Sequence, residues 1–269
     1  MGKKMKNAPV YYTLAQARHN PILRLGAYVP DIQDRMRKAG FPDHQRTSTL
    51  VVPLLFGAPP EGQTDAQRTL PRPSERHLFL SSDGSHGFIV EESSLSFQTT
   101  EYDTFEPFLD AFLTGFGIVH ECIKLDYIER VGIRYLDAVI PPEDSPDDLL
   151  KFLNPGVLGL AGHMPEGVSI GLSVSETHIP LADANLLSRT IVRSGPLGFP
   201  MDLEPQGLTV PQRFKQLNGL HAIIDTDASQ TGRRDVDLAS LRDLMVMLHD
   251  KIRMAFEATV TKHALAVWQ

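Results

Sequence analysis

Apolar residues recur at helical spacing in two long segments of the chain and predict amphipathic helices there. In residues 104–124 they fall three or four positions apart and form one continuous face. Asp237 stands where a cap of the second helix is expected, and Asp103 with Glu106 forms a similar capping pair before the first. The second apolar stripe, in residues 238–260, consists of Leu241, Leu244, Met245, Leu248, Ile252, Ala255 and Phe256.

Period-two alternation predicts strands in the N-terminal half. Strand patterns cover residues 10–22 and 48–56, and a meander precedes the first long helix. The dipeptide Asp83-Gly84 within this meander is a strong hairpin signal. Residues 57–75 are rich in proline and have no periodicity, so we expect them to form the least ordered internal loop.

The C-terminal half repeats this order of elements. A short helix with the sequence DDLLKFL precedes strand patterns in residues 167–179, 184–195 and 220–227, and the second long helix follows them. Strand-helix-strand crossovers with glycine-rich turns are missing from the sequence, which disfavours a doubly wound parallel sheet.

These patterns together predict the fold class and the division of the chain. We expect an α+β fold with a predominantly antiparallel sheet and long amphipathic helices packed on its faces. The two halves, residues 1–140 and 141–269, have a similar element order and form either two domains or one continuous domain. A chain of 269 residues is long enough for either arrangement.

Composition indicates which classes of binding partner and which cellular compartment suit the protein. The net charge of −7 argues against a protein coated in basic residues, although a local basic surface remains compatible with it. The single cysteine, Cys122, excludes an internal disulfide and fits a reducing compartment. Neither a membrane-spanning apolar run nor the apolar stretch of a secretory signal is found, so we expect a cytoplasmic protein.

The stretch YIERVGIRYLDAVI places two arginines in a strand pattern that also has apolar residues to bury. Alternation puts Arg130, Gly132 and Arg134 on one face, with the two arginines about 13 Å apart. A later strand carries Arg189 and Arg193 with the same spacing. If the two strands are neighbours, four exposed guanidinium groups share one surface, and such groups suit phosphate and carboxylate ligands.

Glycine has a specific role in this hypothesis. A second interpretation needs no ligand. Gly132 and Gly195 would leave room for a phosphate-bearing ligand or an acidic partner close to the strands. The alternative is that the arginines are balanced by neighbouring carboxylates and simply cover a half-solvated sheet. Its candidate counter-ions are Glu129, Asp137 and Glu176.

Two carboxylates offer an alternative chemistry. Asp225 and Asp227 lie on one face at the end of a strand pattern, and clustered carboxylate oxygens are what magnesium prefers. Arg233 and Arg234 follow closely and could neutralise them instead, so we favour a structural role with no metal.

Other motifs do not fit their chemical context. Ser169 stands in a G-x-S-x-G match, but a strand pattern follows it instead of the helix that a nucleophile elbow requires. The histidines lack zinc-binding spacing, and His249 fits the edge of a core better than a ligand or a base. Phosphate-binding and dinucleotide-binding glycine motifs are missing as well, and we expect no cofactor.

The arginine-glycine-arginine-tyrosine strand also carries a resemblance. The chain resembles a sporadically distributed prokaryotic family of roughly this length whose function is unknown. That resemblance implies a fold shared along the chain and a distribution typical of mobile or accessory genes, and it implies no catalytic residue. The opening strand is more polar here than in the family. The matching features are Ala8-Pro9, Thr100, Tyr102, Arg130, Gly132, Arg134, Tyr135, Asp225, Asp227 and His249.

We therefore expect a non-enzymatic binding or assembly protein with a local arginine-rich anion-binding surface. Its place in a mobile or defence-type locus follows from the resemblance alone. One alternative is a metal-dependent phosphoryl-transfer or nuclease-like enzyme that uses Asp225 and Asp227, and another is a protein-protein adaptor without an anion site. We expect a protein partner or a homo-oligomer, with a nucleic acid or another phosphate-bearing ligand as a further candidate, and no membrane.

Overall fold

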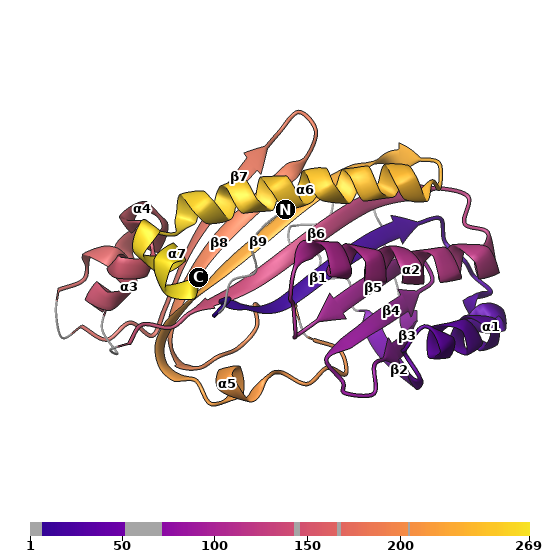
Figure 1. Cartoon of the computed structure of the whole chain (residues 1–269), viewed down its shortest axis with the longest axis horizontal. Coiled ribbons are helices and arrows are strands. Elements are labelled where there is room, and N and C mark those ends of the chain that lie inside the picture. Colours follow the sequence, from indigo (N-terminus) through magenta and orange to yellow (C-terminus); the bar gives the residue numbers. More distant parts are fainter. Residues whose placement is uncertain (1–6, 52–71, 143–145, 166–167, 204) are drawn as a thin grey trace, which may run out of the picture.

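The computed structural model describes residues 7–51, 72–142, 146–165, 168–203 and 205–269. The predicted loop at 57–75 lies outside these residues as far as residue 71, and its last residues belong to a strand. The described residues form an α+β fold around one antiparallel sheet, as predicted (Figure 1).

The sheet has nine strands among the described residues, and every neighbouring pair is antiparallel. Their order across the sheet is β2-β3-β4-β5-β1-β6-β9-β8-β7. The strands are β1 (Val10–His19), β2 (Asp43–Val51), β3 (Arg72–Leu80), β4 (His86–Glu91), β5 (Ser94–Thr99), β6 (Ile128–Val139), β7 (Leu172–Pro180), β8 (Asn185–Pro196) and β9 (Asn218–Arg234).

The chain passes through the centre of the sheet twice, in β1 and in β6. After β1 the chain passes to the outer strand β2 and returns hairpin by hairpin until β5 pairs with β1. After β6 it passes to the opposite edge, β7, and returns until β9 pairs with β6. The sheet continues across the predicted boundary at residue 140, because β6 pairs with β1 on one side and with β9 on the other.

Three long helices, α1 (Leu25–Lys38), α2 (Phe105–Ile123) and α6 (Leu238–Thr259), contribute to the main core. All three pack on the same face of the sheet, which we name the helical face (Figure 1). At the end of the sheet formed by the second half, the shorter α3 (Pro146–Phe152), α4 (Pro155–Leu158) and α7 (Lys262–Trp268) enclose a second cluster. None of the helices in the described part of the chain is long and apolar enough to cross a membrane.

The two predicted long helices are confirmed, with one correction at a cap. Asp237 caps α6, because its side chain accepts a hydrogen bond of 2.7 Å from the backbone N–H of Ser240. The N-cap residue of α2 is Thr104 instead of the predicted Asp103, and the side chain of Thr104 makes no capping hydrogen bond. The opening strand, despite its polar sequence, is buried because β1 lies at the centre of the sheet.

The opposite face, which we name the polar face, is covered at one end by the connection between β8 and β9. This connection, residues 197–217, is named the strap and contains one short helix, α5 (Gln212–Lys215). It reaches across the sheet to the turn between β3 and β4, where the backbone N–H of Thr209 donates to the carbonyl of Gly84 at 2.8 Å. Apolar residues of the strap bury Tyr11 and Tyr12 beneath it.

A glycine in α2 marks the tightest contact between a helix and the sheet. A Cβ atom added to Gly115 would lie 2.2 Å from a ring carbon of Phe88, which is fully buried on β4. We expect Gly115→Ala to lower the free energy of unfolding by about 1–3 kcal/mol, although alanine is the better helix former. Chemical denaturation followed by circular dichroism measures this change.

The matched control lies two residues further along the same helix. At Gly117 the nearest atom to an added Cβ is a methyl carbon of Leu238 at 3.7 Å, an ordinary contact. Gly117→Ala should therefore stabilise the protein by about 0.5–1 kcal/mol. Equal effects of the two substitutions would contradict this packing of α2 on Phe88.

Candidate functional site

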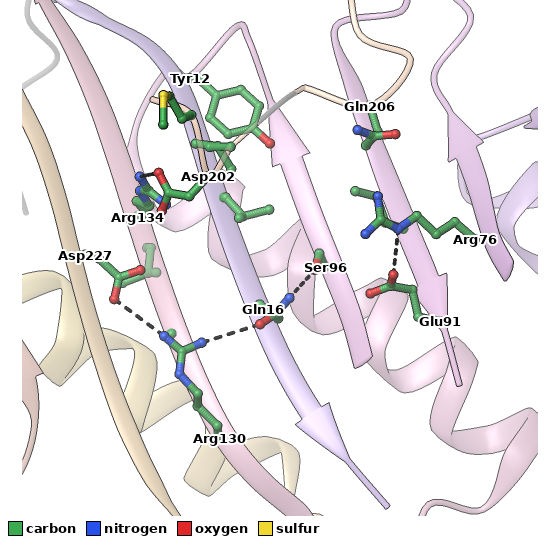
Figure 2. A pocket seen from close by; sticks show the side chains of 16 residues that line it. Tyr12, Gln16, Arg76, Glu91, Ser96, Arg130, Arg134, Asp202, Gln206 and Asp227 are labelled. Carbon is green, nitrogen blue, oxygen red and sulfur yellow. Dashed lines mark hydrogen bonds and ion pairs between the residues drawn. The ribbon is translucent and has the colours of Figure 1, made fainter. Parts of the chain in front are cut away.

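The polar face carries an open hollow of about 490 Å³ beside the strap (Figure 2). Residues of six strands, β1, β3, β4, β5, β6 and β9, and of the strap surround it. Because the three long helices lie on the helical face, much of this polar lining meets solvent, although Tyr12 and Arg134 are buried. The lining residues are Tyr12, Leu14, Gln16, Arg76, Ile89, Glu91, Ser96, Arg130, Gly132, Ile133, Arg134, Met201, Asp202, Leu203, Gln206 and Asp227.

The strands that carry the predicted arginines are not neighbours. Between β6 and β8 lies β9, which carries Asp225 and Asp227. In the register of the sheet, Arg134 stands opposite Asp227, and Asp225 stands opposite Arg189. Directly opposite residues point to the same face, so the predicted arginine surface and the predicted metal ligands form one mixed cluster.

Arg134 is buried, which corrects the expectation of an exposed side chain. Its guanidinium donates two hydrogen bonds to the fully buried carboxylate of Asp225, from Nε at 2.7 Å and from Nη2 at 2.8 Å. Burial alone would lower the pKa of Arg134, but the hydrogen bonds to Asp225 and Asp202 outweigh it and raise that pKa. This bidentate pair anchors the guanidinium from beneath.

A second carboxylate, Asp202, reaches the same guanidinium from the strap. It accepts hydrogen bonds from Arg134 at 2.9 and 3.2 Å and from Arg189 at 3.4 and 3.3 Å. Burial would raise the pKa of Asp202, but the two arginines hold it at about 2. The side chain of Asp202 is 51% exposed, so two arginines from strands separated by β9 converge on one solvent-accessible carboxylate.

Arg130 lies further along the hollow and has longer contacts. Its Nη2 is 3.5 Å from Asp227, and its Nη1 donates to Gln16 at 3.4 Å (Figure 2). A Cβ atom added to Gly132 would lie 3.1 Å from Nη1 of Arg130. The space that Gly132 leaves therefore accommodates the guanidinium of Arg130 flat on the strand.

The remaining predicted residues lie around this cluster. Arg193 stands opposite His221 on β9, and its guanidinium approaches Gly198 at the start of the strap, beyond the lining of the hollow. Gly195 pairs with Gly219 near the end of β8.

Of the predicted counter-ions, one pairs with a predicted arginine. Glu176 on β7 lies 3.1 Å from Nε of Arg189. Glu129 lies 3.7 Å from Arg233, and Asp137 belongs to the helical face, two residues after Tyr135 on β6.

The predicted neutralisation of the aspartates comes from different arginines than expected. Asp225 pairs with Arg134 and Arg189, whereas the guanidinium of Arg233 lies 3.7 Å from the ring centre of Tyr127. Within the described residues, no group of three or more histidine, cysteine, aspartate or glutamate side chains is arranged to hold a metal ion.

Ser169 and His249, which two other sequence motifs had singled out, have surroundings that fit structural roles. Ser169 is exposed and followed directly by β7, so no helix begins behind it. On the helical face, His249 stacks on Phe105 with ring centres 3.9 Å apart, and its Nδ1 lies 3.2 Å from the hydroxyl of Tyr135. Tyr135 donates a hydrogen bond of 3.1 Å to Tyr102. These aromatic residues form a half-buried cluster at the edge of the core.

Several lining residues were not predicted from the sequence. Gln16 and Ser96 alternate with apolar neighbours on β1 and β5 and are hydrogen-bonded to each other at 3.1 Å, so alternation could have placed them on the polar face. Asp202 had no usable signal, because it lies in an irregular connection.

Comparisons with known proteins give no functional assignment for these residues. No family model matches the chain, and no curated protein matches it. The resemblance to a prokaryotic family therefore stays a prediction.

Proposed function

We propose that the protein is a non-enzymatic binding protein that holds an anionic group of its ligand on the polar face. The site consists of Arg134 and Arg189, with Arg130 as a second contact in the hollow. The observation that carries this proposal is the convergence of Arg134 and Arg189 on the half-exposed carboxylate of Asp202. Asp202 occupies the position that a carboxylate or phosphate of a ligand would take.

The charge balance of this face favours a ligand with few charges over a polyanion. Nucleic-acid affinity depends mainly on phosphate neutralisation by unpaired basic side chains. Around the hollow, the ion pairs of the described residues join four arginines to five carboxylates. The pairs involve Arg76, Arg130, Arg134 and Arg189 with Glu91, Glu176, Asp202, Asp225 and Asp227.

The chemistry of the lining supports binding over catalysis. Guanidinium groups, paired carboxylates and the amides of Gln16 and Gln206 bind and orient a ligand through hydrogen bonds. A role as an accessory component of a mobile or defence-type locus rests on the resemblance alone.

Replacing Asp202 tests the proposal. Asp202→Asn removes the internal carboxylate and leaves both arginines in place, so it should raise the affinity for inorganic phosphate and for succinate, by roughly tenfold. Arg189→Gln in the Asp202→Asn background should abolish that gain. Isothermal titration calorimetry at low salt measures both affinities, which should weaken as salt is added.

Arg233→Gln is the matched control, because this exposed arginine lies on Tyr127 away from the hollow. It should leave both affinities unchanged. Unchanged binding in Asp202→Asn, or an equal loss in Arg233→Gln and Arg189→Gln, would contradict an anion site between Arg134 and Arg189.

A further inference from the structure

The edge strand β7 presents an exposed surface along its whole length. It lies at the end of the sheet and pairs with β8 on one side only (Figure 1). Its nine residues are all exposed or half-buried. The outer edge of such a strand presents backbone N–H and C=O groups that can pair with another strand.

Edge strands of soluble proteins usually carry features that prevent pairing, such as lysines, internal prolines or bulges. The register between β7 and β8 runs from Leu172 to Pro180 without a shift, and the one proline of the strand is its last residue. Glu176 pairs with Arg189 of the neighbouring strand β8 and with His178 of its own strand.

Apolar side chains gather at this edge as well. Leu172 is 66% exposed and Val174 is 53% exposed, and both point to the polar face. On the helical face a 3₁₀ helix (Gly159–His163) packs against β7, and its Leu160 is 71% exposed. Exposed apolar side chains on both faces of an unprotected edge indicate a surface for a partner.

The sequence of β7 is complementary to itself in one antiparallel register. In a two-fold pairing within one sheet, opposite residues must point to the same face, so the axis lies midway between one residue and the same residue of the second copy. An axis at Glu176 would place two glutamates opposite each other, which is unfavourable. An axis at Thr177 instead places Glu176 opposite His178 of the second copy, twice, with Val174 opposite Pro180 of the second copy.

We infer that β7 pairs antiparallel with β7 of a second copy of this chain about a two-fold axis at Thr177. The pairing runs from Val174 to Pro180 in each copy and joins the two sheets into one. Because the same edge is used twice, the assembly closes as a dimer and leaves no free β7 edge. The inference is independent of the ligand proposed for the polar face.

Sedimentation of the full chain over a range of about 1–500 µM tests the dimer. We expect a reversible monomer–dimer equilibrium. Val174→Lys should raise the dimer dissociation constant at least about tenfold, because a lysine on the edge opposes strand pairing. The matched control is Val246→Lys, at a 38% exposed valine of α6, which should leave the constant unchanged. A chain that stays monomeric over the whole range overturns the inference and leaves the edge to a different protein.

Cross-linking tests the register and does not depend on weakening the edge. In a Cys122→Ser background, Thr177→Cys should form a disulfide-linked dimer on mild oxidation, because Thr177 faces Thr177 of the second copy. Ser173→Cys, on the same face of β7, should remain unlinked. Linkage through Ser173 without linkage through Thr177 would overturn the proposed axis.

Discussion

Asp225→Asn should lower the free energy of unfolding by about 3–5 kcal/mol, because it leaves buried arginine without its main partner. The carboxylate of Asp225 is fully buried and accepts two hydrogen bonds from Arg134, and it lies 3.4 Å from Nε of Arg189. The amide of asparagine keeps the shape but carries no charge and can accept at one oxygen only. Urea denaturation at neutral pH measures the loss.

Asp202→Asn provides the control for this prediction. Asp202 binds the same two arginines, but its side chain is 51% exposed, so water can replace its contacts. We expect a change within about 1 kcal/mol. The double variant Arg134→Met with Asp225→Asn should be less destabilised than Asp225→Asn alone, because it removes the unpaired buried charge. If Asp225→Asn lowers the free energy of unfolding no more than Asp202→Asn does, the buried Arg134–Asp225 pair does not stabilise the protein.

Asp137→Asn should stabilise the protein, by roughly 2–4 kcal/mol at pH 8 and by almost nothing at pH 4. Burial raises the pKa of Asp137 from its ordinary value of 3.8 to about 7. At pH values between these two pKa values, Asp137 keeps its proton in the folded state but has released it in the unfolded state. The stability of the native protein therefore falls as the pH rises through this window, and asparagine removes that loss.

His249 changes the free energy of unfolding with pH in the opposite direction, so the experiment must distinguish its contribution from that of Asp137. Burial lowers the pKa of His249 from 6.5 to about 4, so its stabilising contribution is present above the higher value and is lost as the pH falls toward the lower one. Denaturation of native protein, Asp137→Asn and His249→Gln at several pH values between 4 and 8 distinguishes the two groups. A gain in Asp137→Asn that is the same at pH 4 and pH 8 would show that burial does not raise the pKa of Asp137.

Local sequence patterns predicted much of the fold because they depend on neighbouring residues. The apolar stripe of α6 follows from helical periodicity, and its cap follows from one aspartate, Asp237, at the correct position. The Asp83-Gly84 signal predicted the hairpin between β3 and β4. The predicted N-cap of α2, Asp103, lies one residue before the observed N-cap, Thr104.

Sequence patterns predicted some features of the candidate site and could not predict others. Alternation correctly placed Arg130 and Arg134 on one face of β6, because side chains of a strand point to opposite faces in turn. It could not show that β9 lies between β6 and β8, nor that Asp225 would neutralise arginines on both sides. It also gave no indication of Asp202.

The sequence by itself therefore determined the two long helices, most of the strands and the alternation of side chains along each strand, since these follow from backbone geometry over a few residues. Only the tertiary structure decided which charges meet. Arg134 and Asp225 are 91 positions apart in the chain, and Arg134 and Asp202 are 68 apart. Such contacts depend on the order of strands in the whole sheet and on the path of the strap, and both are set by the burial of the entire apolar core.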